Sequence, residues 1–283
     1  MALLTPSEST GEKKLGVGLF APEIPFSGPA ERYRLVQGIA QHLSNGLGVP
    51  FEGRAYKTAH DFARDVQRGT IHFAVLGGLY VATDRQSRIL AIGQLARNDP
   101  WTIMAGKLKT IEELKGKVLQ IPGLGPITVR FVENGLLAGS VDVKKTFLIK
   151  MAPDLRSAQT AVRLGRADAA LAPVSSPGLT KVVDGLRIPP PAFVGLDKQL
   201  PQATVDKVTR LMLSYGVAIA GIQGWKRGDR VPYHRLVALS AKKTYRMMLA
   251  PVGIVHLEDQ QLINIKALRP SLPTLEGKLF WVP

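Results

Sequence analysis

Short apolar runs alternate with amphipathic stretches along most of this chain, and this alternation limits the folds that it can adopt. Leu15–Phe20 and Ile71–Leu76 are apolar runs of strand length. Glu31–Asn45 instead places Leu35 and Ile39 on one face of a helix. Strands that alternate with helices are typical of an α/β fold, in which helices pack on mainly parallel sheets.

Length and composition narrow the possibilities further. The chain has 283 residues, of which 45% are hydrophobic and 21% charged, which is ordinary globular composition. This length is enough for two lobes, each with its own core. The chain has no cysteine, which excludes a zinc-thiolate site, a disulfide scaffold and a cysteine nucleophile.

The sequence contains no targeting signal that we recognise. No apolar run approaches the ~20 residues that span a bilayer, and residues 1–14 lack the apolar core of a signal peptide. Two interpretations remain open: a cytoplasmic protein, or a protein whose cleaved leader is missing from this sequence.

The order of elements predicts two lobes. The first lobe is expected over residues 14–98 and the second over residues 99–190. Pro189-Pro-Pro191 is expected to lead back to the first lobe, so that residues 191–283 complete it and add a C-terminal extension.

Capping residues predict where several helices begin. Thr58 and Thr110 each precede an acidic residue by three positions, as in a capping box. Asp154 is expected to cap a helix that ends at Gly165. Further helices are expected from Pro126 to about Ala138, as a short segment from Ser175, and over 201–215.

Four passages resemble the phosphate, phosphite and phosphonate substrate-binding proteins of ABC transporters. The first is a strand followed by a proline-containing loop and a long helix. The second, Gly69–Tyr80, is similar to that family's "G-x-(V/I)-D-(L/F)-A … G-P-x-x-Y" passage. Thr110–Lys117 is similar to its "S-L-x-D-L-K-G-K", and Ala161–Ala170 to its "A-V-x-x-G-x-A-D-A".

The resemblance implies a type 2 periplasmic-binding-protein fold, with two α/β lobes around a hinge and a cleft. It further implies a non-enzymatic protein that binds a small oxyanion, such as phosphate or a phosphonate, between the lobes. It implies a place in the periplasm or cell envelope, and a membrane transporter or envelope protein as partner.

The same resemblance places candidate ligand contacts at helix starts, because free N–H groups and the helix dipole favour an anion there. These residues lie in both lobes: Thr58, Gly77, Gly78, Tyr80, Gly125, Thr128, Ser157 and Ser175.

This chain departs from the family at several of these positions. The family's hydroxyl-rich "S-T-S-G" loop reads Gly123-Leu-Gly-Pro-Ile-Thr128, where Leu124 is expected at the place of a ligand oxygen and Pro126 lacks an N–H. The acid that commonly follows the Ala167–Ala172 strand is absent. One interpretation is a retuned small-ligand site; the alternative is a degenerate site in a structural or interaction module of an envelope assembly.

Other chemistry finds little support. The five histidines are scattered, without metal-binding spacing. No phosphate-binding loop, nucleophile elbow, or paired nucleophile and base occurs. We therefore expect no enzyme activity, no metal and no cofactor.

Positive charge gathers toward the C-terminus. The chain has a net charge of +15, and basic and aromatic residues interleave over 225–246. Such a segment suits an anionic surface or partner, although a solvated helical face with inward-packed aromatics is the alternative. No nucleic-acid motif is present. The candidate contacts are Lys226, Arg227, Arg230, Lys242, Lys243 and Arg246.

Overall fold

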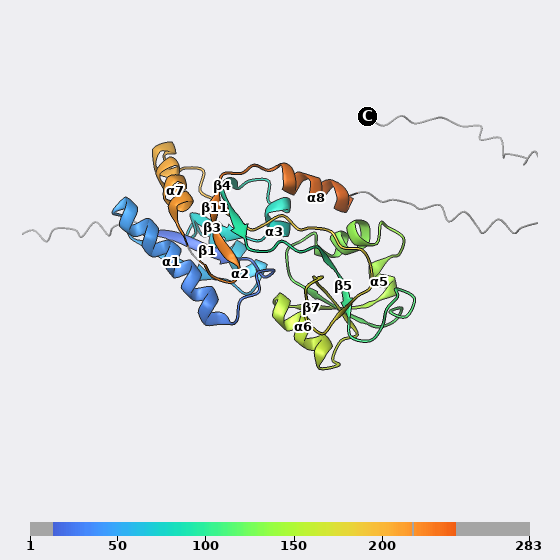
Figure 1. The fold of residues 1–283 in the computed structure, drawn as a ribbon. Helices are drawn as coiled ribbons and strands as arrows, with labels where there is room; N and C mark the ends of the chain where they lie inside the picture. Colours follow the sequence, from blue (N-terminus) through green and yellow to red (C-terminus); the bar gives the residue numbers. More distant parts are fainter. Residues whose placement is uncertain (1–13, 217, 242–283) are drawn as a thin grey trace, which may run out of the picture. The chain divides into compact units, whose positions relative to one another are not determined.

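The computed structural model describes residues 14–216 and 218–241, which all lie in one compact unit (Figure 1). Two separate β-sheets organise this unit, one with six strands and one with five. The predicted α/β class is confirmed. The predicted contacts Lys242, Lys243 and Arg246 lie outside the described residues.

The first sheet has the strand order β11-β4-β10-β3-β1-β2. β1 pairs in parallel with β2 and β3, whereas β10 is antiparallel to β3 and β4, and β11 is antiparallel to β4. Its strands are β1 (Leu15–Phe20), β2 (Phe51–Ala55), β3 (Phe73–Leu76), β4 (Arg88–Leu95), β10 (Ala192–Gly195) and β11 (Ile222–Lys226).

The second sheet has the order β7-β6-β8-β5-β9. β6 is parallel to β7 and β8, and β5 runs antiparallel to β8 and β9. Its strands are β5 (Trp101–Ala105), β6 (Val118–Pro122), β7 (Leu148–Ala152), β8 (Ala169–Pro173) and β9 (Thr180–Lys181). The lobe boundaries at residues 98 and 190 remain a prediction.

Helices connect these strands. They are α1 (Pro29–Leu47), α2 (Ala59–Gln67), α3 (Gly78–Thr83), α4 (Thr128–Arg130), the π-helical η1 (Phe131–Leu136), α5 (Val143–Thr146), α6 (Leu155–Arg163), α7 (Gln202–Ser214) and α8 (Val231–Ala241).

Local sequence explains several helix starts. Pro29 begins α1, where its missing N–H costs nothing. The Thr58 side chain accepts a hydrogen bond from the Asp61 N–H, and the Asp154 side chain accepts one from the Ser157 N–H, so both act as the predicted N-caps.

Two predicted helices do not form. The Thr110 capping box is present, with Glu113 N–H donating to Thr110 and Thr110 N–H to Glu113, yet residues 111–116 form turns. So few residues before Gly116, which has φ of 73°, cannot propagate a helix. The helix expected from Ser175 is a turn as well, and the helix expected over 126–138 is shorter and largely π-helical.

One hydrophobic cluster is shared by the two sheets. It joins Phe20, Phe62 and Leu79 on the side of the first sheet to Ile103 and Ile121 of the second. A separate cluster lies between the other face of the first sheet and helices α1 and α7. The shared cluster means that the two sheets are packed together and are not merely tethered.

Two crossover segments, residues 96–100 and 182–191, connect the sheets. The start of β5, directly after the first crossover, is joined to the second crossover, where Trp101 N–H donates to Leu186 O at 2.7 Å and Leu186 N–H donates to Trp101 O at 2.9 Å.

Two of the three prolines of the second crossover accept hydrogen bonds through their carbonyl groups. Pro190 O accepts from the Tyr233 hydroxyl at 2.8 Å, and Pro191 O accepts from Gly93 N–H at 2.8 Å. The carbonyl of the remaining proline, Pro189, faces Gly78. The second crossover is therefore held by hydrogen bonds from α8 and from β4 of the first sheet.

Helix α8, which lies in the basic and aromatic segment, contacts α3 beside the first sheet and η1 beside the second (Figure 1). Tyr233 and Leu236 bury its apolar face in the shared cluster. At its end, the Asn134 side chain of η1 donates to Ser240 O at 2.6 Å. α8 therefore ties together elements associated with both sheets.

Candidate functional site

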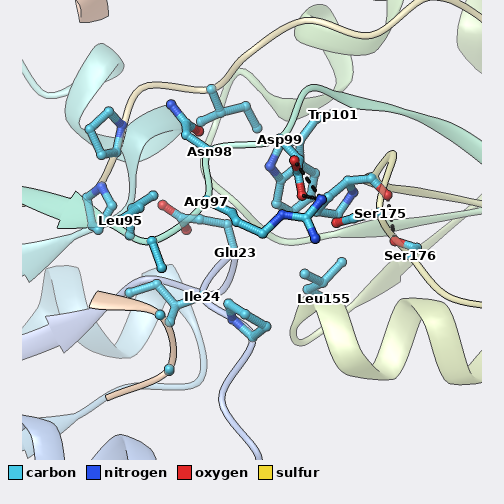
Figure 2. A pocket seen from close by; sticks show the side chains of 18 of the residues that line it. Glu23, Ile24, Leu95, Arg97, Asn98, Asp99, Trp101, Leu155, Ser175 and Ser176 are labelled. Carbon is cyan, nitrogen blue, oxygen red and sulfur yellow. Dashed lines mark hydrogen bonds and ion pairs between the residues drawn. The ribbon is translucent and has the colours of Figure 1, made fainter. Parts of the chain in front are cut away.

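A cavity of about 560 Å³ lies beside the two crossover segments (Figure 2), and we call it the crossover cavity. Both sheets and both crossovers contribute to its wall, which is largely apolar. The lining residues are Glu23, Ile24, Pro25, Leu95, Ala96, Arg97, Asn98, Asp99, Trp101, Leu155, Gln159, Pro173, Ser175, Ser176, Pro177, Ile188, Pro189, Pro190, Pro191, Ala220 and Gly221. This volume is within the range of small-molecule sites.

Glu23 is the most unusual group in this wall. It lies in the proline-punctuated loop after β1, and its Oε1 accepts a hydrogen bond from the Gly78 N–H at 2.6 Å. Its other oxygen, Oε2, is buried and has no hydrogen-bond partner among the described residues. A buried polar atom without a partner is costly, so it calls for an explanation.

The buried surroundings of Glu23 disfavour the ionised form of its carboxyl group. Burial raises the pKa of the Glu23 carboxyl to about 7, although hydrogen bonding with its own backbone N–H and with that of Gly78 lowers it. Across residues 14–216 and 218–241, no basic side chain forms an ion pair with Glu23. In Figure 2 the Arg97 guanidinium extends away from Glu23 toward Asp99.

Asp99, Gln159 and Ser176 of the cavity wall are paired within the protein. Asp99 is bound by Arg97 at 3.1 Å, and the Ser175 hydroxyl and Arg97 lower its pKa. The Gln159 amide donates to the Ser176 hydroxyl at 2.7 Å, which in turn donates to Pro173 O. Glu23 thus differs from these polar neighbours in having an oxygen that no described protein group satisfies.

The helix starts that were predicted to bind an anion largely meet other parts of the protein. The Glu23 carboxylate takes the Gly78 N–H at the start of α3. At the start of α6, Asp154 accepts from Ser157 N–H, and Leu155 N–H donates to Pro22 O at 3.1 Å. Asp154 also pairs with Arg32 at 3.2 Å. These donors are no longer free for an external oxyanion.

The loop after β6 rests directly on α3. A Cβ atom on Gly125 would lie 3.2 Å from Tyr80 Cα and 3.3 Å from Tyr80 N. Leu124 differs from expectation, because it is fully buried in the shared cluster and does not face a ligand position. Gly125, rather than Leu124, brings this loop into contact with α3.

A second hollow, of about 440 Å³, lies next to that contact, and we call it the Thr58 pocket. It brings together two of the predicted ligand residues, Thr58 and Gly125, and adds the cationic Lys57. Its other lining residues are Ala59, Gly123, Pro126, Met151, Ala152 and Pro153.

Two of the remaining predicted ligand residues have structural hydrogen bonds. Thr128 is buried and donates to Gly125 O at 2.6 Å, which fixes the loop. Gly77 N–H donates to Phe20 O at 2.9 Å, which ties the start of α3 to the end of β1. Ligand contact by either residue stays a prediction.

The last three predicted ligand residues do not converge on one place. The Tyr80 ring packs edge-on against Phe20 and Phe62. Ser175 lines the crossover cavity, whereas Ser157 lines neither cavity. Their contact with a ligand also stays a prediction.

The described part of the basic segment is partly structural. Tyr233 of α8 is buried, as an inward-packed helical face requires, and Trp225 of β11 is buried as well. Arg230 donates to Asp84 O at 2.7 Å and to the Ser87 hydroxyl at 3.2 Å. Lys226 and Arg227 are exposed, so they are the two described residues of the predicted partner surface that remain accessible.

Sequence reasoning missed Glu23 altogether. An acidic residue between two prolines in a loop is usually solvated, and only tertiary packing buries this one. The absence of a lysine or arginine from the loop Ala21–Ser27 was the one available hint.

Two further searches concern metals and membranes. Among residues 14–216 and 218–241, no group of three or more acidic or histidine side chains could hold a metal ion. In the same ranges, no helix is long and apolar enough to cross a bilayer.

Comparison by structure identifies the fold. PhnD1 from Prochlorococcus marinus in complex with methylphosphonate superposes with a TM-score of 0.64 at 12% identity, over 81% of this chain and 97% of that one. This chain has the type 2 periplasmic-binding-protein fold.

Two further structures agree. A binding-protein component of an ABC phosphonate transporter from Pseudomonas aeruginosa gives a TM-score of 0.64 at 13% identity, over 81% and 85% of the chains. An ATP-bound protein from Xanthomonas citri gives 0.60 at 12%, over 81% and 96%. No family model matches the sequence, and no curated protein matches it significantly. At such identities the likeness concerns the fold.

Proposed function

We propose that this chain is a non-enzymatic solute-binding protein that encloses a small ligand in the crossover cavity. The observation that carries the proposal is a cavity of about 560 Å³ whose wall comes from both sheets and both crossovers. In a protein built of two lobes, such a cavity can open and close as the lobes move about their connections. Structures of similar fold hold methylphosphonate and ATP.

The proposal extends to partners and location. A solute-binding protein of this fold would deliver its ligand to a membrane transporter, from the periplasm or cell envelope. The accessible Lys226 and Arg227 belong to the surface proposed for such a partner. The lobe boundaries proposed from sequence, 14–98 and 99–190 with a return over 191–283, describe the two parts between which the ligand would lie.

The oxyanion predicted from sequence is a second ligand class for the same function. The Thr58 pocket would be its place, because Lys57 supplies positive charge beside Thr58 and Gly125. Backbone N–H groups at the starts of α3 and α6 already donate hydrogen bonds to other groups of the protein. We therefore rank an oxyanion below a ligand of the crossover cavity.

A thermal-shift panel with calorimetry tests the function. The full chain is mixed separately with phosphate, phosphite, methylphosphonate, sulfate, and small neutral and cationic organic molecules. A ligand that binds only the folded state raises its stability by about 2.7 kcal/mol at a hundred times its Kd. A saturable rise in Tm with at least one class supports the proposal.

A second function rests on a specific observation, namely that internal groups occupy the predicted anion-binding helix starts. The fold would then serve as an interaction module of an envelope assembly. If no molecule of the panel changes Tm or releases heat, the solute-binding proposal fails. Loss of an envelope association on reversing the charges of Lys226 and Arg227 would then favour the module.

A further inference from the structure

We propose that the crossover cavity is selective for a small organic amine: an apolar body that carries one cationic, hydrogen-bond-donating end, bound by the free Oε2 of Glu23. This inference rests on the proposed solute-binding function and specifies its ligand class. The cavity is separate from the Thr58 pocket proposed above for an oxyanion, and of the predicted ligand residues only Ser175 lines it.

The first argument is the unsatisfied oxygen. Oε1 of Glu23 has a structural task, since it accepts the Gly78 N–H at the start of α3. Oε2 has none, and it is buried. A ligand N–H that donates to Oε2 would satisfy a buried acceptor for which residues 14–216 and 218–241 supply no donor.

The second argument is charge. Arg97, which also lines the cavity, is paired with Asp99 through both carboxylate oxygens, at 3.2 and 3.1 Å. Within the described part of the chain, Glu23 therefore has no cation of its own beside it. A ligand cation would form the missing ion pair, whereas a ligand anion would meet an uncompensated buried carboxylate.

The third argument is the remaining wall. Apart from Glu23, the interior surface is formed largely by Ile24, Leu95, Trp101, Leu155 and the prolines of the second crossover. Such a surface stabilises an apolar ligand body through burial. The combination of one buried acceptor and an apolar wall fits an amine with a compact hydrocarbon body.

The neighbouring groups keep their charge states while Glu23 titrates, so a pH effect on ligand binding can be assigned to Glu23. Tyr233 of α8 has a pKa raised by burial, with Glu23 contributing, so it stays neutral. Asp99, which is paired with Arg97, has a lowered pKa and stays ionised. The faces contributed by α6 and the second crossover present Leu155, Gln159 and prolines, which do not titrate.

The experiment compares end groups on constant bodies. Cyclohexylamine, cyclohexanol and cyclohexanecarboxylate form one series, and 2-phenylethylamine, 2-phenylethanol and 3-phenylpropionate form the other. Each is titrated calorimetrically into the full chain at about pH 8, where the Glu23 carboxyl is mostly ionised and an alkylamine, with a pKa of about 10, is protonated. We expect the amine of at least one series to bind about tenfold or more tightly than its alcohol, and its carboxylate not to bind.

Two substitutions test whether Glu23 causes the preference for the amine. E23Q keeps an oxygen for the Gly78 N–H but replaces the free acceptor by a donor, so amine affinity should fall about tenfold or more. E52Q is the matched control, since it makes the same change at the exposed end of a surface ion pair outside the cavity wall. E52Q should bind the amine as the wild type does.

A pH series replaces the variant if E23Q does not fold. Lowering the pH from about 8 to about 5.5 protonates a carboxyl whose pKa is near 7. Wild-type affinity for the amine should fall about tenfold, while affinity for the alcohol should change little.

The two proposals fail in distinguishable ways. If an oxyanion or a carboxylate binds and no amine does, or if folded E23Q keeps the amine affinity, the amine selectivity is wrong and solute binding stands. If neither the six probes nor the oxyanion panel binds, both proposals are wrong.

Discussion

Gly125 packs its backbone against Tyr80 at a φ of 146°, a conformation that favours glycine. Gly125→Ala should lower the free energy of unfolding by about 1–3 kcal/mol, because the new Cβ would be strained and would crowd the start of α3. Urea denaturation measures this loss.

Gly123→Ala is the matched control for that change. A Cβ there would have Ala152 O as its nearest contact, at an ordinary 3.6 Å. Its effect should stay within about 0.5 kcal/mol. Equal losses for the two variants would contradict the importance of the Gly125–Tyr80 contact.

Glu23 makes stability depend on pH in a defined direction. Its pKa is raised from 4.5 to about 7 in the folded protein. Folding therefore favours the protonated carboxyl, and this contribution is complete below about pH 4.5 and is lost as the pH rises through about 7. Over that window the wild type should lose on the order of 3 kcal/mol relative to E23Q, which cannot ionise.

Urea titrations of both proteins at several pH values measure this difference. The subtraction removes the titration of groups that the two proteins share. A difference that is flat between about pH 4.5 and 7, or that grows in favour of the wild type, would contradict a buried, unpaired carboxylate at this position.

Residues whose role is local could be predicted from sequence, whereas those defined by tertiary contact could not. Thr58 and Asp154 cap helices as expected, because capping depends on the following three residues. Gly78, which stands where the family's "G-P-x-x-Y" passage has a proline, is explained by the fold. Its N–H is required by Glu23, and a Cβ would collide with Pro189 O.

At the scale of elements, α8 can be tested through two leucines of the same helix. Leu236 is 2% exposed and packs in the cluster shared by the sheets, whereas Leu239 is 44% exposed. Leu236→Ala should cost about 2–4 kcal/mol through lost burial and the remaining cavity. Leu239→Ala should cost less than about 1 kcal/mol.

Hydrogen exchange adds the spatial readout for α8. Because α8 contacts both α3 and η1, Leu236→Ala should increase exchange in both of those helices. Increased exchange confined to α8 itself would contradict its role in connecting them.

Helices and strands were predicted best where the hydrophobic periodicity agrees with the residues that begin and end the element. The strand Leu15–Phe20 was predicted with its observed bounds, and α7 within one residue at each end. The Thr110 segment has its capping bonds but too few residues for a helix. For α8, the structure agrees with the alternative of a helical face with inward-packed aromatics, because Tyr233 and Leu236 are core residues.

At the scale of the described unit, the shared hydrophobic cluster predicts joint unfolding of the two sheets. Differential scanning calorimetry should show one transition whose calorimetric and van 't Hoff enthalpies agree. Two resolved transitions, each removed by mutation in one sheet only, would show that the sheets unfold independently.

The anchored prolines of the second crossover have a kinetic consequence. Three consecutive residues have fixed φ, and Pro190 and Pro191 are bonded to Tyr233 and Gly93. A solute whose release requires movement of this crossover has to wait until these bonds and the paired Trp101–Leu186 link break. Dissociation should therefore be slow, and the residence time of a bound molecule, rather than its rate of arrival, should set the affinity.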